Sequence, residues 1–259
     1  MVFLRLLLLN LRACVYVLYC LITVIPFAAL AIPLWLCPVS TRFAVLRFWP
    51  RLAVHAARWI LGIRWHIKGL EYLPQYGAGA VLMPKHQSTW ETFFLCGFLE
   101  SSPVFVYKKQ LNWIPLFGWG LKSLKWIAID RTQRVAAFEQ VKLASRTVID
   151  NGRSIIMFPE GTRTTIGAET AYKSGGTRLA IHLGVPVIPI AHNAGALWPR
   201  RAWLKQPGLI TVSIGKPISS INKESEQLLS EVKSWIEYEM QCISPEFYLQ
   251  PHHHLSTVK

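Results

Sequence analysis

The sequence predicts an α/β fold, with a sheet of mixed strand direction flanked by helices and preceded by a helical membrane anchor. Two observations carry this prediction. Residues 13–36 contain no charged side chain. From residue 63 onward, short apolar runs alternate with longer stretches whose apolar residues recur at helical spacing. Alternating strands and helices are typical of a sheet covered by helices.

The chain has 259 residues, enough for one sizeable core and a short extra segment. We expect an anchoring segment over 1–62, a core domain over 63–245 and a tail over 246–259. The five cysteines are scattered and lack CxxC spacing, which favours a reducing environment. The tail histidines His252, His253 and His254 have no paired Cys or carboxylate cluster, and we predict no metal site and no cofactor.

The anchor is the first element. At about 1.5 Å per residue, residues 13–36 could cross a hydrocarbon core of roughly 30 Å. The stretch is too long for a signal peptide and ends in no small-x-small pattern, so we expect it to be retained. Pro26 and Pro33 would each interrupt a helix, and basic residues flank both sides. Two arrangements stay open: a spanning helix, or a broken hairpin that returns to the same face.

A second membrane-related segment follows at 43–62. Its basic residues recur at helical spacing among aromatic and aliphatic ones, which puts them on one helical face: Arg47, Arg51, His55 and Arg58. We expect a helix lying in the headgroup layer. The alternative is an ordinary helix packed on the core.

The core domain supplies strands and helices in turn. We expect strands over 65–68, 79–83, 104–107, 126–129, 154–158, 187–191 and 209–214. Helices are expected from 88, from 113, and over 135–151 and 175–184. Asn222 is expected to cap a last amphipathic helix whose apolar residues repeat at helical spacing: Leu228, Leu229, Val232, Trp235, Ile236 and Met240.

A histidine motif directly follows the strand expected at 79–83. It reads Lys85-His86-Gln87-Ser88-Thr89-Trp90-Glu91, an HX4E arrangement, at the point where ligands bind in open α/β sheets. A free imidazole has a pKa of about 6.5, so His86 is a candidate general base at neutral pH. Glu91 could accept from the other ring nitrogen and fix the tautomer. Alternatively, Glu91 could complete a capping box with Ser88.

A second motif, Phe158-Pro159-Glu160-Gly161-Thr162-Arg163, follows the strand expected at 154–158. The guanidinium of Arg163 can bind a phosphomonoester through two nitrogens. Gly161 permits close backbone approach, and Thr162 supplies a hydroxyl. Glu160 is unusual beside an anion, and we assign it to orienting Arg163 or a substrate hydroxyl. The alternative for the whole string is a solvated turn.

Together the two motifs resemble those of the glycerolipid acyltransferase family. Two further blocks resemble the family's in the same order: 108–118 with Ile129-Asp130-Arg131, and Val185-Pro186-Val187-Ile188-Pro189-Ile190. The resemblance covers residues 63–215. It departs at Lys85 and Glu91, where the family usually has Asn and Asp.

This resemblance implies both a function and its residues. His86 would deprotonate the sn-2 hydroxyl of 1-acyl-sn-glycerol-3-phosphate, with Glu91 as its partner. The alkoxide would attack the thioester of acyl-CoA or acyl carrier protein, giving phosphatidic acid without a covalent acyl-enzyme. The phosphate would be held by Lys108, Arg131, Glu160, Gly161, Thr162 and Arg163. Lys173 could assist the anion, and the apolar strand with Pro189 could form a wall that contacts the acyl chain or the acyl donor.

Charge and composition narrow the partners. The formal charge is +14, from 28 Lys and Arg against 14 Asp and Glu, and attracts anionic partners. Because the chain has 52% hydrophobic residues and 11 Trp, it suits membrane lipid better than nucleic acid as a partner, and we exclude nucleic acid. We expect a membrane location with the catalytic domain facing the cytoplasm, at a bacterial inner membrane. The alternatives are glycerol-3-phosphate or another lysolipid as acceptor, or a non-catalytic membrane lipid-binding protein.

Overall fold

The computed structural model of the protein describes residues 2–74, 78–100, 102–114, 117–130, 132 and 134–248. Arg131 and the three tail histidines, whose roles were predicted above, lie outside the described residues.

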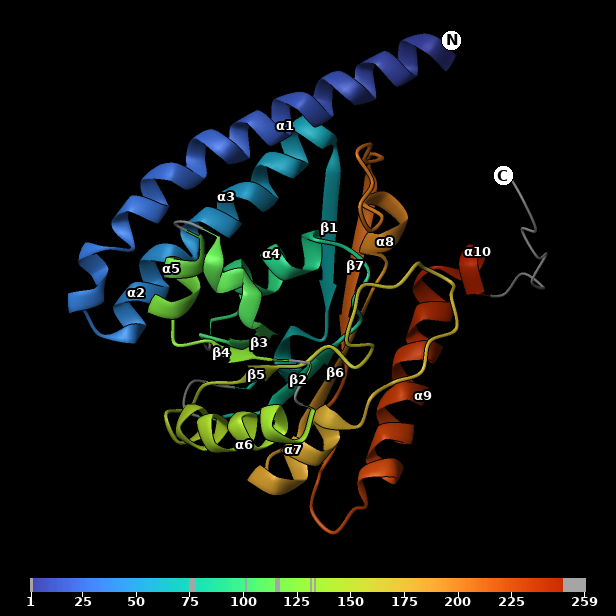
Figure 1. The fold of residues 1–259 in the computed structure, drawn as a ribbon. Coiled ribbons are helices and arrows are strands. Elements are labelled where there is room, and N and C mark those ends of the chain that lie inside the picture. Colours follow the sequence, from blue (N-terminus) through green and yellow to red (C-terminus); the bar gives the residue numbers. More distant parts are fainter. Residues whose placement is uncertain are drawn as a thin grey trace.

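A mixed sheet forms the centre of the molecule (Figure 1). Its strands lie in the order β1-β7-β6-β2-β5-β3-β4. Each pair of neighbours is parallel except β6 and β7, which confirms the predicted mixed direction. The strands are β1 (Ile63–Lys68), β2 (Val81–Pro84), β3 (Val104–Lys108), β4 (Ile127–Ile129), β5 (Ile155–Ile156), β6 (Val187–His192) and β7 (Gly208–Ile214).

Helices cover both faces of the sheet (Figure 1). One side carries α1 (Val2–Leu30), α2 (Val39–Leu46), α3 (Phe48–Ala56), α4 (Trp90–Phe98) and α5 (Phe117–Ser123). The other side carries α6 (Arg134–Asp150), α7 (Gly175–Leu183) and α9 (Ser225–Ile243). Shorter elements are η1 (Pro33–Leu36), η2 (Ala57–Leu61), η3 (Leu70–Tyr72), η4 (Lys109–Trp113), α8 (Ala194–Leu197) and α10 (Pro245–Tyr248).

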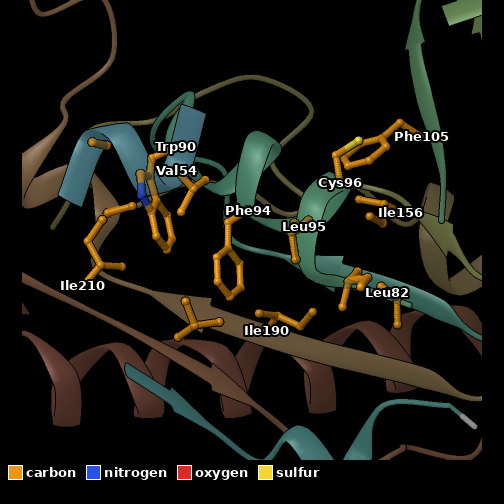
Figure 2. Close-up of a cluster of buried hydrophobic side chains, with 14 of the residues drawn as sticks. Val54, Leu82, Trp90, Phe94, Leu95, Cys96, Phe105, Ile156, Ile190 and Ile210 are labelled. Atoms are coloured by element: carbon orange, nitrogen blue, oxygen red, sulfur yellow. The ribbon is translucent and has the colours of Figure 1, made fainter. Parts of the chain in front are cut away.

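Two apolar clusters fix the sheet between these layers. Side chains alternate along a strand, so Leu82 of β2 faces one layer while Val81 and Met83 face the other. The cluster on the α4 side is drawn in Figure 2 and includes Val54, Leu82, Trp90, Phe94, Leu95, Cys96, Phe105, Ile156, Ile190 and Ile210. Burial on both faces explains why the parallel strands are continuous apolar runs.

Helix α1 lies along the outside of the domain (Figure 1). Its polar contacts are spread along its length and pair Asn10 with Trp203, Tyr16 with the Ala53 carbonyl, and Thr23 with Trp49, at 3.0, 3.2 and 3.3 Å. The helix runs through Pro26, and the chain forms a new short helix only at Pro33. The helix therefore lies against the same domain from Leu9 to Ala28, while its first turns are exposed.

The outward side of α1 is apolar and exposed. Leu11 is 59% exposed and Leu18 is 58% exposed. Within the described residues, the segment Val2–Leu36 is long and apolar enough to cross a membrane, and only 17% of an 18-residue apolar window in it is buried. It is therefore not an internal core helix.

The single amphipathic helix predicted over 43–62 is wrong. The segment is divided into α2, α3 and η2, with Arg47 at the junction of the first two. Arg51 is half-buried and bonds the Gly97 carbonyl of α4, whereas Arg58 is exposed over the Trp59 ring. The basic residues do not share one solvent face, because α3 packs directly against the core.

The predicted cap of the last helix is also wrong. Asn222 has φ 57°, a left-handed conformation that Asn tolerates, and α9 starts only at Ser225 after Glu224. The backbone uses Asn222 for the turn before the helix. At its other end, α10 lies in the range expected as a tail, and the Tyr248 hydroxyl accepts a hydrogen bond from Gln87.

Candidate active site

The two motif loops meet at one edge of the sheet. Strands β2 and β5 are parallel neighbours in register from Val81 and Ile155, so the loops that follow them leave the same edge. The Thr164 amide donates to the His86 carbonyl at 2.8 Å. The structure thus brings the histidine motif and the second motif into direct contact.

His86 and Glu91 are paired. The Nδ1 atom of His86 lies 2.9 Å from Oε1 of Glu91, which is buried at the start of α4. Burial raises the pKa of Glu91, but the hydrogen bonds from His86 and from the Ser88 amide lower it by more, so the net pKa lies below its ordinary value. The carboxylate is therefore an acceptor, Nδ1 carries the proton, and Nε2 is left to take another.

The same carboxylate oxygen also caps the helix. The amides of Gln87 and Ser88 donate to Oε1 of Glu91 at 3.3 and 3.1 Å. The two roles that were alternatives at the level of sequence thus occur together. A carboxylate held by backbone amides cannot swing away from the histidine, so the pair is preorganised.

The ring of His86 lies at the wall of a cavity. Its face stacks on Phe158 with ring centroids 3.7 Å apart. The cavity has a volume of about 310 Å³, and its lining combines His86, Gly161 and Lys173 with mainly apolar residues of β3, β4, α6, the segment directly after β5 and the start of α7. A reactive polar end and an apolar remainder suit an amphiphilic substrate.

Gly161 brings the second motif close to a cation. It has φ 69°, and a Cβ at this position would lie 2.7 Å from Nζ of Lys173. A side chain here would be strained and would displace the lysine. Lys173 is exposed, lines the cavity with His86, and its amide bonds the Pro159 carbonyl.

Glu160 has a different place from the one we expected. It is 2% exposed and accepts from the His86 amide at 2.6 Å, with Lys85 at 3.2 Å. Its contacts are with the chain itself, so its carboxylate is not open to a phosphate. Burial raises the pKa of Glu160 to about 7.

The other predicted phosphate residues are spread around the edge. Nε of Arg163 donates to the Ser88 carbonyl at 2.6 Å, so the guanidinium joins the two loops. Thr162 is exposed beside it, and Lys108 is exposed at the end of β3. Pro189 is buried within β6, opposite Met83 of β2.

Two polar residues close to the His86 loop were not predicted from the sequence. His192 is buried at the end of β6, and its Nε2 donates to the Lys85 carbonyl at 2.8 Å. Glu237 of α9 lies 2.6 Å from Nζ of Lys85. A polar residue ending an apolar strand could have signalled His192, whereas nothing local distinguishes Glu237 from the other charges of its helix.

The comparison with known proteins decides the family. A family model described as Acyltransferase matches residues 64–193. The chain belongs to the acyltransferase family. It is 41% identical over 213 residues to the 1-acyl-sn-glycerol-3-phosphate acyltransferase of Pseudomonas aeruginosa, covering 80% of this chain and 81% of that protein.

Other relatives extend this acyltransferase match. A 1-acyl-sn-glycerol-3-phosphate acyltransferase of Cocos nucifera is 30% identical over 66% of this chain, which spans 54% of that longer protein. The crystal structure of the 1-acyl-sn-glycerophosphate acyltransferase PlsC from Thermotoga maritima superposes with a TM-score of 0.75, at 22% identity, covering 93% of this chain and 97% of the other. The predicted family, enzyme class and fold are confirmed.

Proposed function

We propose that this acyltransferase moves a fatty acyl group from acyl-CoA or acyl carrier protein to the sn-2 hydroxyl of 1-acyl-sn-glycerol-3-phosphate, forming phosphatidic acid. The observation that carries the proposal is the His86–Glu91 pair at the wall of a cavity that also contains Lys173. The printed names of the relatives support the choice of acceptor.

The pair accounts for each proton in the reaction. Nε2 of His86 takes the proton of the sn-2 hydroxyl, while Glu91 stabilises the imidazolium through Nδ1. The alkoxide oxygen forms a bond to the thioester carbonyl carbon. The carbon–sulfur bond then breaks, and the leaving thiolate receives the proton from Nε2.

The acceptor phosphate is assigned to the cations of the second motif. Lys173 lines the cavity of His86, and Arg163 lies on the adjoining loop with Gly161 and Thr162. Lys108, at the same edge of the sheet, is kept as a further phosphate contact. Arg163 uses Nε within the chain, and its two remaining amino groups match two phosphate oxygens.

We assign the protein to one face of the membrane, with the catalytic domain in the cytoplasm. If α1 spanned the membrane, the end of the helix on the far face would lie about 30 Å from the catalytic domain on the near face. Contacts near both ends of α1 oppose that arrangement, and its exposed apolar side suits a helix lying in the membrane surface. An acceptor that resides in the bilayer would then meet the cavity laterally.

The function is tested by transfer of a labelled acyl group from acyl-CoA or acyl carrier protein to 1-acyl-sn-glycerol-3-phosphate, using purified full-length protein in mixed micelles. We expect His86→Ala to lower kcat by roughly 10²–10⁴-fold, the usual contribution of a general base. His182→Ala, at an exposed histidine of α7, is the matched control.

A second arm of the same assay addresses the phosphate. Lys173→Met should raise KM for the acceptor more than it changes kcat, because a charged hydrogen bond of about 1.5–3 kcal/mol is lost. Lys216→Met, at an exposed lysine beyond β7, is its control. Wild-type protein that is folded but inactive with both donors would reject this acceptor. Glycerol-3-phosphate and other lysolipids would then be tried, and inactivity with all of them would favour the non-catalytic lipid-binding alternative.

A further inference from the structure

Lys85, directly before the histidine, is held in a buried charge cluster. It is 1% exposed, with Nζ 2.6 Å from Oε1 of Glu237 and 3.2 Å from Oε1 of Glu160. Nζ also donates to the Tyr172 hydroxyl at 3.2 Å. Burial lowers the pKa of Lys85, but the facing acidic groups outweigh it and the pKa is raised, so the lysine stays charged.

Glu160 connects this lysine to the backbone of His86. One carboxylate oxygen faces Lys85, and the other accepts from the His86 amide at 2.6 Å. A hydrogen bond to an ionised acceptor is roughly twice as strong as a neutral one. The backbone amide of Thr164 donates to the His86 carbonyl. The hydroxyl of Thr164 also donates to the Glu160 carboxylate, at 3.1 Å. The backbone N–H of His86 is thus held by Glu160 of the second motif, and its carbonyl is held by Thr164 directly after that motif.

The third member of the cluster comes from the distant helix α9. Glu237 is 152 residues from Lys85 in sequence, and it also accepts from the Tyr172 hydroxyl at 2.7 Å. Helix α9 packs against β6 and α7 and contributes no residue to either motif. Its glutamate balances a lysine that would otherwise pair with Glu160 alone.

We propose that Lys85 is a positioning residue, which by bridging Glu160 to Glu237 of α9 holds the His86 backbone, and with it the ring, in the geometry for proton transfer. The kinetic consequences rest on the proposed function, whereas the backbone restraint does not. Helix α9 thereby acquires a part in the reaction.

Removal of the lysine has a defined physical effect. Lys85→Met keeps the length of the side chain but leaves the buried carboxylate of Glu160 and the partly exposed carboxylate of Glu237 without a cation between them. Glu160 then holds its proton more strongly, and its bond to the His86 amide loses the assistance of charge. Lys85→Asn, the residue usual in the family, is too short to reach Glu237 and should act in the same direction.

The kinetic test compares Lys85→Met, Glu237→Gln and wild type. We expect kcat of Lys85→Met to fall on the order of 100-fold, as for a misplaced catalytic group, with little change in KM for the acceptor. Glu237→Gln keeps the shape of the cluster and should lose less, so it remains informative if Lys85→Met fails to fold. The matched control is Lys223→Met, which removes the lysine paired with Glu231 elsewhere on α9.

A pH profile separates positioning from general loss of structure. Because Lys85 lowers the pKa of Glu160 from what burial alone would give, its removal should move the acid limb of kcat to higher pH. The titratable groups facing Lys85 and Glu160 are Tyr172, His192, Glu237 and Tyr248, and all are retained in Lys85→Met. A loss of kcat that is equal at every pH would overturn the proposal.

Amide hydrogen exchange supplies a readout that needs no substrate. The amide of His86 should exchange faster in Lys85→Met and Glu237→Gln than in wild type and Lys223→Met. Unchanged exchange in both variants would overturn the positioning role even if the transferase assay succeeds. Faster exchange would support it even if wild type proves inactive with 1-acyl-sn-glycerol-3-phosphate, so the two proposals fail separately.

Discussion

Lys85 and Leu18 lie in surroundings opposite to those usual for their side chains. Lys85 is 1% exposed in the centre of the domain, whereas Leu18 is 58% exposed on α1. Charged side chains are almost never fully buried unless they are paired, and contiguous apolar surface is rare on soluble monomers. The lysine has three partners at hydrogen-bond distance, and the leucine belongs to an apolar stripe facing outward.

This difference shows that the presence of a suitable partner determines whether a side chain is buried in this protein, more than the polarity of the side chain does. Around the histidine, charged groups of the loop after β2, α4, the loop after β5 and α9 lie close enough to pair with one another. Along α1, the exposed leucines have no protein partner, and a lipid surface is the environment that suits them. The predictions below test the two regions separately.

The largest expected effect is in the buried polar region. Glu91→Gln can keep an amide oxygen in the place of Oε1, the atom that accepts from His86, Gln87 and Ser88, but it removes the negative charge that stabilises the protonated His86 ring. The corresponding loss in serine proteases is about 10⁴-fold, and we expect kcat to fall by a comparable factor. The assay is acyl transfer at saturating acceptor, with Glu139→Gln on the surface of α6 as control. Near-normal kcat with reduced stability would leave Glu91 only its capping role.

Next in size is an effect on the apolar core. Phe94→Ala removes a side chain that is 3% exposed and should lower the free energy of unfolding by about 3–5 kcal/mol. Leu18→Ala should change it by no more than about 0.5 kcal/mol in detergent, because no core contact is lost. Denaturant unfolding of both variants in the same micelles measures the difference. Equal losses would show that α1 is part of the core and would remove the contrast.

A smaller effect is expected at the lipid-facing surface. Leu18→Glu removes the free energy gained when one leucine side chain moves from water into lipid, about 1.5–3 kcal/mol. Binding to lipid vesicles should therefore weaken by at least roughly tenfold. Leu143→Glu, at a leucine of α6 that is 78% exposed on the other layer, should bind as wild type does. Vesicle sedimentation measures both. Equal weakening by the two substitutions would contradict the assignment of α1 to the membrane.

The smallest effect concerns pH. Burial lowers the pKa of His192, so the folded protein keeps this ring neutral while the unfolded chain protonates it below about pH 6.5. The stability contributed by His192 is therefore present above that pH and is lost as the pH falls. Between pH 7.5 and 5.5, wild type should lose about 1 kcal/mol more than His192→Asn. Denaturant unfolding at the two pH values tests this, with His66→Asn at an exposed histidine as control. Identical slopes would exclude the effect.

The order of strands and helices in the core domain could be predicted from the sequence, and so could the meeting of the two motifs at one edge of the sheet. Both motifs follow apolar runs, and parallel neighbouring strands must deliver their loops to one edge. The sequence was not sufficient for the residues that hold them together. Glu237 meets Lys85 only because α9 packs back onto the sheet, and no local pattern encodes that contact.

Other failures differ in origin. The 43–62 segment has helical spacing, but it is divided just before Pro50, which has no backbone N–H to donate, and this cause is local. The contact of Arg51 with the Gly97 carbonyl of α4 depends on tertiary packing. Glu160 belongs to a motif that resembles a phosphate site, yet its burial and its bond to the His86 amide could be known only from the fold.

The bond between Asn10 and Trp203 also constrains the order of events during synthesis. The two residues are separated by 193 positions, and at about 5–20 residues per second the ribosome needs roughly 10 to 40 seconds to make the second after the first. The apolar segment leaves the ribosome long before the surface that will receive it exists. On the proposed assignment of α1 to the membrane, the nascent chain would reach the lipid first, and the remainder of the domain would fold against a helix that already lies there.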